Sequence, residues 1–128
     1  MQLLLDTHAL IWWLHGDRRM SRTSRASIDD SDNEVFVSAA SAWEITTKFR
    51  LGKLPDVKIL AEDVGATLTR VGFKGLPITV HQAAKAGGLP GPLKDPFDRL
   101  LIAQALLEGI ALVSNEATFD VYGVTRVW

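Results

Sequence analysis

The 128-residue sequence contains no cysteine. This excludes disulfide bonds, thiolate catalysis and zinc sites with sulfur ligands, and it suits a reducing compartment. No apolar run approaches the ~18 residues of a membrane-spanning helix, and no basic segment precedes the first apolar stretch. We therefore expect a cytoplasmic protein with no membrane span and no signal peptide.

Glycine-rich phosphate loops are also absent. Neither G-x-G-x-x-G nor G-x-x-x-x-G-K-[ST] occurs, which argues against a nucleotide-binding enzyme. The net charge is only -1, so the chain lacks the broad positive potential of proteins that hold nucleic acid by bulk charge. Any contact with nucleic acid must be local, and the basic clusters at 18–25 and 48–53 either supply it or are solvated helix faces.

What the chain does have is enough apolar sequence for a core. It is 47% hydrophobic and 23% charged, which at this length is sufficient for one globular domain without metal or disulfide staples. No internal repeat, low-complexity tract or linker divides it. We expect a single domain over residues 1–128.

Short apolar runs alternate with helical patterns along the sequence. Helices are predicted at 7–15, 21–29, 39–50, 56–71, 80–86 and 96–108, and strands at 3–5, 34–37, 73–78, 110–113 and 124–128. The 73–78 segment contains Gly75 and Pro77, which favour an edge position. Strands separated by helices predict an α/β fold, with a short parallel sheet covered by helices on both faces.

The first strand points to a functional edge of this sheet. Three consecutive leucines, residues 3–5, are typical of a strand buried on both faces in the middle of a parallel sheet. Asp6 follows at its carboxyl end, where ligands gather in open α/β sheets. Asp6 is therefore a candidate for chemistry.

Three further acids are predicted at the same edge. Glu116 lies just beyond the 110–113 strand, while Asp98 and Glu44 lie in the first and second turns of their helices. A helix that connects parallel strands runs antiparallel to them, so its N-terminus lies over the carboxyl ends of the strands. The topology thus brings four acids from separate parts of the chain together.

Such a cluster is unstable without a cation. Two carboxylates about 5 Å apart repel by roughly 3 kcal/mol at an effective dielectric of about 20. Oxygen ligands without cysteine or paired histidines favour a hard ion, Mg²⁺ or Mn²⁺, over zinc. A hydrated ion held in this way suits hydrolysis of a phosphodiester in a nucleic-acid backbone.

Each acid also has a purely structural interpretation. Asp98 could favour the helix dipole, and Glu44 could form a capping box with Ser41. Asp6 could cap the helix that follows it, and Glu116 could be an ordinary turn residue. The metal-site hypothesis depends on all four converging.

Four motifs together resemble the PIN domain, and specifically a VapC-type toxin of a type II toxin-antitoxin system. The resemblance spans nearly the whole chain. The motifs, in the order and spacing of the family, are Leu3-Leu-Leu-Asp6-Thr-His-Ala-Leu10, Ser38-Ala-Ala-Ser-Ala-Trp-Glu44-Ile45, Asp95-Pro-Phe-Asp98-Arg-Leu-Leu-Ile-Ala-Gln-Ala105 and Leu112-Val-Ser114-Asn-Glu116.

The resemblance implies a PIN-like three-layer α/β/α fold and an endoribonuclease that uses Mg²⁺ or Mn²⁺. Asp6, Glu44 and Asp98 match the acidic metal-site residues of the family. Glu116 takes a position where the family commonly has aspartate, which adds one methylene of reach. The resemblance further implies an RNA substrate, neutralisation by a cognate VapB-type antitoxin, and a homodimer.

Neighbouring residues have supporting roles in this interpretation. Thr7 and Ser114 are expected to orient the carboxylates or a bound water. Asp95 is favoured as the helix N-cap over an additional ligand. Arg99 is a candidate phosphate contact, or else the partner of a neighbouring acid.

Two other functions were weighed against this one. A phosphatase of the haloacid-dehalogenase type would need a second aspartate where this chain has His8, which largely removes that class. The remaining alternative is a catalytically impaired PIN-fold module that binds RNA or protein, with Glu116 marking the loss of activity. Cleavage that depends on a divalent metal would distinguish the two.

Overall fold

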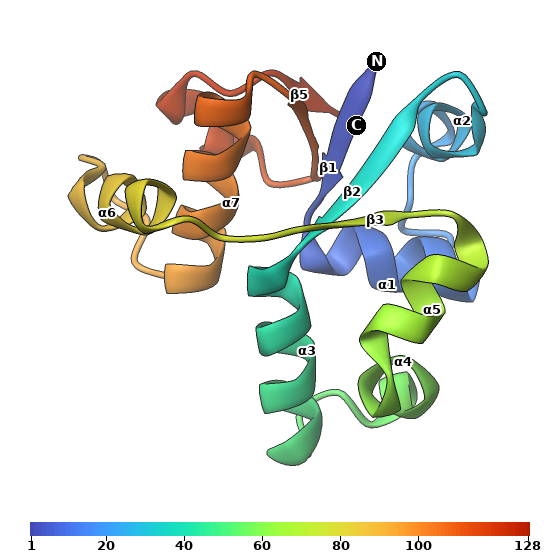
Figure 1. Ribbon diagram of the computed structural model, residues 1–128. Helices are drawn as coiled ribbons and strands as arrows, with labels where there is room; N and C mark the ends of the chain where they lie inside the picture. Colours follow the sequence, from blue (N-terminus) through green and yellow to red (C-terminus); the bar gives the residue numbers. More distant parts are fainter.

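The computed structural model describes all residues 1–128, and its centre is a five-stranded parallel sheet with strand order β3-β2-β1-β4-β5 (Figure 1). The strands are β1 (Gln2–Leu5), β2 (Glu34–Ser38), β3 (Lys74–Leu76), β4 (Ala111–Val113) and β5 (Arg126–Val127). The α-helices are α1 (Thr7–His15), α2 (Arg22–Asp29), α3 (Ala39–Arg50), α4 (Lys58–Glu62), α5 (Val64–Val71), α6 (Val80–Gly88) and α7 (Pro96–Glu108). Two 3₁₀ helices, η1 (Pro55–Val57) and η2 (Ala117–Tyr122), complete the chain.

Strand β1 is the middle strand, as the leucine run predicts. Successive side chains of a strand point to opposite faces, so Leu3 and Leu5 enter one core and Leu4 enters the other. Parallel register sets Leu4 beside Phe36 on β2 and Leu112 on β4. Both faces of the central strands are thus buried, which explains why their sequences lack polar alternation.

Helices cover both faces of the sheet, so the predicted three-layer architecture is confirmed. The larger core packs β1, β2 and β4 against α1, α2, α4 and α5, and the smaller one packs the opposite face against α7. Figure 1 shows α6 and α7 on one side of the sheet and α1, α2 and α5 on the other. The edge position predicted for the 73–78 segment is also confirmed, because β3 pairs only with β2.

Local capping positions the helix starts at the carboxyl end of the sheet. The Ser38 hydroxyl accepts from the backbone N–H of Ala40 at 3.0 Å and begins α3 directly after β2. Asp95 caps α7, with Pro96 at the first helical position. The favoured assignment of Asp95 as an N-cap is therefore confirmed, and the caps fix where Glu44 and Asp98 lie.

The single helix predicted over 56–71 is wrong. The segment forms η1, α4 and α5, and the break falls at Asp63, whose backbone is extended with φ -155° and ψ 89°. The Asp63 carboxylate accepts from the N–H of Ala66 at 2.9 Å, so it caps a new helix in place of continuing the old one. Gly65, in the middle of the predicted helix, lies inside α5.

The chain end also differs from the sequence-based expectation. The final strand is shorter than predicted, because β5 spans Arg126–Val127 only. The 3₁₀ helix η2 occupies the segment before it, which no apolar periodicity had marked. None of the helices combines the length and the apolar character required to cross a bilayer.

Candidate active site

Asp6 lies at the end of β1, where it is 4% exposed. Its carboxylate caps α1 by accepting from the N–H of Ala9 at 2.7 Å. Burial raises the pKa of Asp6 above its ordinary value, against the opposing effect of hydrogen bonds from Ser114 and Ala9. Asp6 is therefore both a helix cap and a buried carboxyl group at the functional edge.

The pKa of the Asp98 carboxyl is affected by the charges of the other predicted acids. Burial raises its pKa to about 7, and repulsion from Asp95, Glu44, Asp6 and Glu116 adds to the shift. The charges of Asp6, Glu44, Glu116 and the neighbouring Asp95 therefore all act on Asp98. A metal site formed by the four predicted acids stays a prediction.

Glu44 and Glu116 differ in their surroundings. Glu44 is 4% exposed and forms an ion pair with Lys48 one turn along α3. No salt bridge forms at Asp6, Asp98 or Glu116, so Lys48 is the one cation paired with the four acids. Glu116 is exposed at the start of η2 and stands at the rim of the cluster.

The donor set fits a hard divalent cation. Its members are carboxylates, and burial first and then their charges raise the pKa of Asp98 toward neutrality; a cation among them would offset the repulsion. In this structure no three acidic or histidine side chains stand close enough together to hold a metal ion.

Ser114 and Thr7 take different supporting positions. The Ser114 side chain lowers the pKa of the Asp6 carboxyl, and its oxygen accepts from the backbone N–H of Glu116 at 3.0 Å. The Thr7 hydroxyl instead donates to Ser41 at 2.9 Å, joining the start of α1 to the first turn of α3. Because Ser41 accepts from Thr7 and Ser38 caps α3, the capping box of Ser41 with Glu44 does not form.

Arg99 does not face the site as a phosphate contact would. Its three guanidinium nitrogens donate to the backbone carbonyls of Ala86, Leu89 and Leu93. The side chain therefore ties the end of α6 and the loop that follows it to α7. The sequence-based expectation of a phosphate contact is corrected, because a neighbouring loop rich in glycine and proline supplies free carbonyls that the guanidinium satisfies.

Behind the acids lies a buried polar network that sequence reasoning missed. Gln104 of α7 is fully buried, accepts from the Ser38 hydroxyl, and donates to Gln82 at 3.0 Å and to the Pro77 carbonyl at 3.1 Å. Gln82 donates onward to Glu108 at 2.8 Å. The available signal was a glutamine set among Ile102, Ala103 and Ala105 on the apolar helix α7.

Comparison with known proteins gives the site a family. The PIN domain family model matches residues 3–124. Ribonuclease VapC22 of Mycobacterium tuberculosis is 30% identical over 122 residues, which cover 89% of this chain and 86% of VapC22. Ribonuclease VapC16 of the same organism is 39% identical over 71 residues, covering 52% of this chain and 49% of VapC16, so this match spans about half of the relative's length.

A solved structure shares the fold. The crystal structure of VapBC2 from Rickettsia felis, bound to a DNA fragment from their promoter, superposes with a TM-score of 0.69 at 14% identity. The superposition covers 98% of this chain and 97% of that one. With the family model matched along nearly its whole length and its acids gathered at one sheet edge, this chain belongs to the PIN-domain family, and VapC ribonucleases are among its relatives.

Proposed function

We propose that this protein is an endoribonuclease toxin of the VapC type, which hydrolyses RNA phosphodiester bonds with Mg²⁺ or Mn²⁺. The observation that carries the proposal is the electrostatic strain at Asp98, whose pKa rises to about 7 beside carboxylates from four parts of the chain. Strongly raised carboxyl pKa values cluster at functional sites, and a bound cation would offset the cost of holding these charges together. Residues 1–128 form a single nuclease domain in this proposal.

Asp6, Glu44, Asp98 and Glu116 would hold the cation. When bound, a divalent ion lowers the pKa of a coordinated water and offsets charge on the phosphate. Asp6 is preorganised for this by the Ala9 N–H, and burial of Asp6 and Glu44 strengthens charge interactions in the site. Asp98 holds a proton below about pH 7 and gives it up as the site becomes fully anionic.

The proposal includes partners and a compartment. A cognate VapB-type antitoxin would neutralise the enzyme, and the similarity to the VapBC2 structure supports such a partner. The protein would act as a homodimer in the cytoplasm, as the resemblance to VapC toxins implies. Its substrate would be RNA, which the ribonuclease names of VapC22 and VapC16 support.

Cleavage of a mixed RNA pool tests this function. The purified protein, free of antitoxin, is incubated with Mg²⁺ or Mn²⁺ and then with EDTA, beside Asp6→Asn. Asp32→Asn is the matched control, since Asp32 is exposed in the turn before β2. Cleavage should require metal and Asp6 but not Asp32. Cleavage by Asp6→Asn at the parental rate would show that Asp6 takes no part in the reaction. Absence of cleavage by the folded parent would favour the binding module instead.

A further inference from the structure

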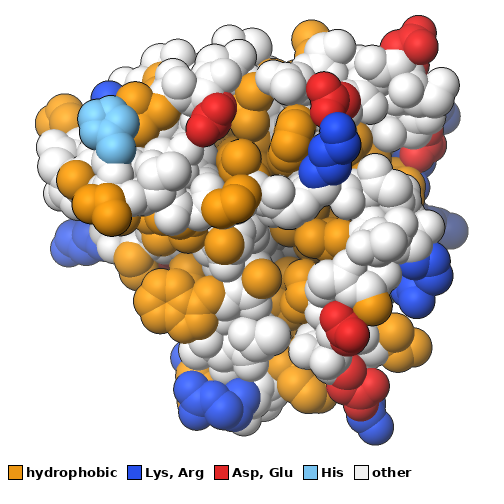
Figure 2. Space-filling view, in the orientation of Figure 1, with side chains coloured by type: hydrophobic (Ala, Val, Ile, Leu, Met, Phe, Trp, Pro, Cys, Tyr) orange, Lys and Arg blue, Asp and Glu red, His pale blue; other side chains and the backbone are white.

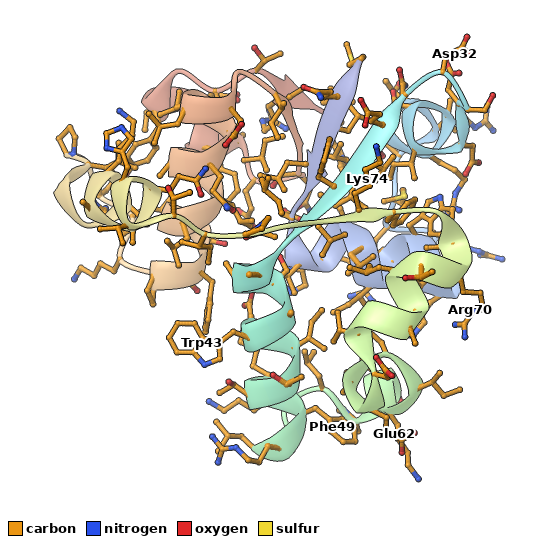
Figure 3. All side chains as sticks on the ribbon, in the orientation of Figure 1. Asp32, Trp43, Phe49, Glu62, Arg70 and Lys74 are labelled. Carbon is orange, nitrogen blue, oxygen red and sulfur yellow. The ribbon has the colours of Figure 1, made fainter.

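One tryptophan is exposed beside the acids. Trp43 of α3 is 59% exposed, whereas Trp12 is buried and Trp13 and Trp128 are partly buried. Figure 3 shows the Trp43 ring projecting from α3 on the side toward α7. In the same orientation, Figure 2 shows a large hydrophobic group standing out at that place on the surface. An indole left in water forgoes much of the stabilisation that burying so large an apolar group provides.

Trp43 is not free to move at random. Its ring packs against Phe97 of α7 with centroids 5.0 Å apart and planes at 79°. An edge-to-face contact of this kind contributes about 0.5 to 1.5 kcal/mol beyond burial. Phe97 therefore restrains the indole while most of its surface stays open, which reduces the entropy lost when a flat ligand binds.

The two aromatic residues, Trp43 and Phe97, are each next in sequence to a predicted acid. Trp43 immediately precedes Glu44, and Phe97 immediately precedes Asp98. The charge of Glu44 acts on Asp98 across the same two helices, α3 and α7. Because Trp43 contacts Phe97 across the same two helices that carry Glu44 and Asp98, the open indole lies where α3 meets α7, beside the acidic site.

The overall charge of the protein contributes little to the affinity for RNA at this site. The protein has a net charge of -1, the site itself is acidic, and Arg99 and Lys48 are committed to other groups. Stacking of bases on aromatic side chains is the other general source of affinity for single strands, at about 1 to 3 kcal/mol per base. It also works beside carboxylates, because it needs no positive charge.

We propose that Trp43, braced by Phe97, is a stacking platform for an unpaired base of the RNA next to the cleaved phosphodiester. The platform rests on the proposed ribonuclease function and makes its substrate single-stranded at that position. A base inside a duplex has both faces covered, whereas an unpaired base can be splayed onto an aromatic ring. Trp43 is then a residue that determines specificity and leaves the metal ligands unaffected.

Binding of a fluorescein-labelled single-stranded RNA tests the platform. Fluorescence anisotropy is measured with Mg²⁺ for three proteins that all carry Asp6→Asn, so that the RNA stays intact. One keeps Trp43, and the other two carry Trp43→Phe or Trp43→Ala. Trp43→Ala should weaken binding by about 5- to 100-fold, and Trp43→Phe by less, since a phenyl ring still stacks. The salt dependence should not change, because no phosphate contact is lost. Ile59→Ala, which truncates another exposed apolar side chain, should bind like the parent.

Abasic substitution of the RNA, one nucleotide at a time, identifies the stacked base. One abasic position should weaken RNA binding by the protein that keeps Trp43, and the same position should leave RNA binding by the Trp43→Ala variant unchanged. An equal abasic loss in both proteins, or unchanged RNA affinity of Trp43→Ala, would overturn the platform. If Trp43→Ala instead disrupted a dimer or antitoxin complex with RNA affinity unchanged, the indole would belong to a protein interface and the platform would again be overturned.

The cleavage assay of the parent separates the two proposals. RNA cleavage by the parent, together with equal RNA affinity of the Trp43 and Trp43→Ala proteins, would remove only the platform. If the parent neither cleaved nor bound single-stranded RNA, the proposed ribonuclease function and the platform would both fail. In the active background, the platform predicts that Trp43→Ala raises KM and leaves kcat nearly unchanged.

Discussion

Helix α7 carries two polar clusters that differ in charge. At its N-terminal end, Asp98 faces other carboxylates and its pKa rises to about 7. Two turns later, Gln104 lies in a buried network of uncharged side chains with Ser38 and Gln82, which ends at the exposed carboxylate of Glu108. No buried side-chain nitrogen or oxygen in either cluster lacks a hydrogen-bond partner. Only at Asp98 do several carboxylates act on one another's charge, and this repulsion distinguishes a site suited to a cation from a structural polar network.

Removing the charge at Asp98 should have the largest effect. Asp98→Asn is expected to lower the RNA cleavage rate at least about a hundredfold, because a carboxylate that stabilises the reacting charges is lost. The initial rate under saturating Mg²⁺ measures this loss, with Asp32→Asn as the control. An Asp98→Asn rate near that of the parent would place the chemistry elsewhere.

Breaking the neutral network should reduce stability. Gln104→Leu keeps the approximate volume but leaves the Pro77 carbonyl and the Ser38 hydroxyl without their partner. We expect the free energy of unfolding in urea to fall by about 2 kcal/mol, the usual cost of unpaired buried polar groups. Gln2→Leu, at an exposed glutamine, should change it by less than about 0.5 kcal/mol. Equal effects would mean that the network contributes little.

The pH dependence of stability sharpens the contrast. Because the folded-state pKa of Asp98 lies above the unfolded value, the folded protein binds more protons, and stability falls as pH rises from about 4 to about 7. After allowance for solvent screening at this half-buried group, the fall is about 1 to 2 kcal/mol. Urea unfolding in EDTA at pH 5 and pH 8 should show this fall in the parent and a smaller one in Asp98→Asn. An unchanged difference would show that Asp98 is not strained.

The smallest effect is expected at Glu116, at the edge of the acidic site. Glu116 is exposed, so shortening it by one methylene in Glu116→Asp should keep the cleavage rate within about tenfold of the parent, or 1.4 kcal/mol. Glu116→Gln, which removes the charge, should reduce the rate more than Glu116→Asp. Rates in the reverse order would show that the reach of Glu116 matters more than its charge.

Most of the fold could be predicted from the sequence, because local signals and packing agreed. The leucine run marked the central strand, and the Asp95-Pro96 pair marked the start of α7. Asp63 was missed because an apolar periodicity across 56–71 concealed a residue that caps a helix better than it continues one. The 3₁₀ helix η2 was missed because a short turn of this kind has no periodicity to detect.

The acids of the site could be predicted from topology alone, because parallel strands bring their carboxyl ends to one edge. Hydrogen-bond and packing partners that depend on tertiary contacts could not be predicted from the sequence. Arg99 looked available for phosphate, but it is bonded to carbonyls of α6 and of the loop after it, and the buried hydrogen bonds of Gln104 depend on α6 packing against α7. Trp43 could be counted from the sequence, but its exposure and its contact with Phe97 depend on how α3 meets α7.

The most direct test of the central claim is calorimetric titration of the metal-free protein with Mn²⁺, at pH 6 and pH 8, in buffers of different ionisation enthalpy. If the carboxylates form a strained metal site, Mn²⁺ should bind and release protons, more at pH 6 than at pH 8, because Asp98 must lose its proton. The Asp98→Asn variant should bind Mn²⁺ more weakly and release fewer protons than the parent. Absence of Mn²⁺ binding by the folded parent, or binding without proton release at pH 6, would contradict the account.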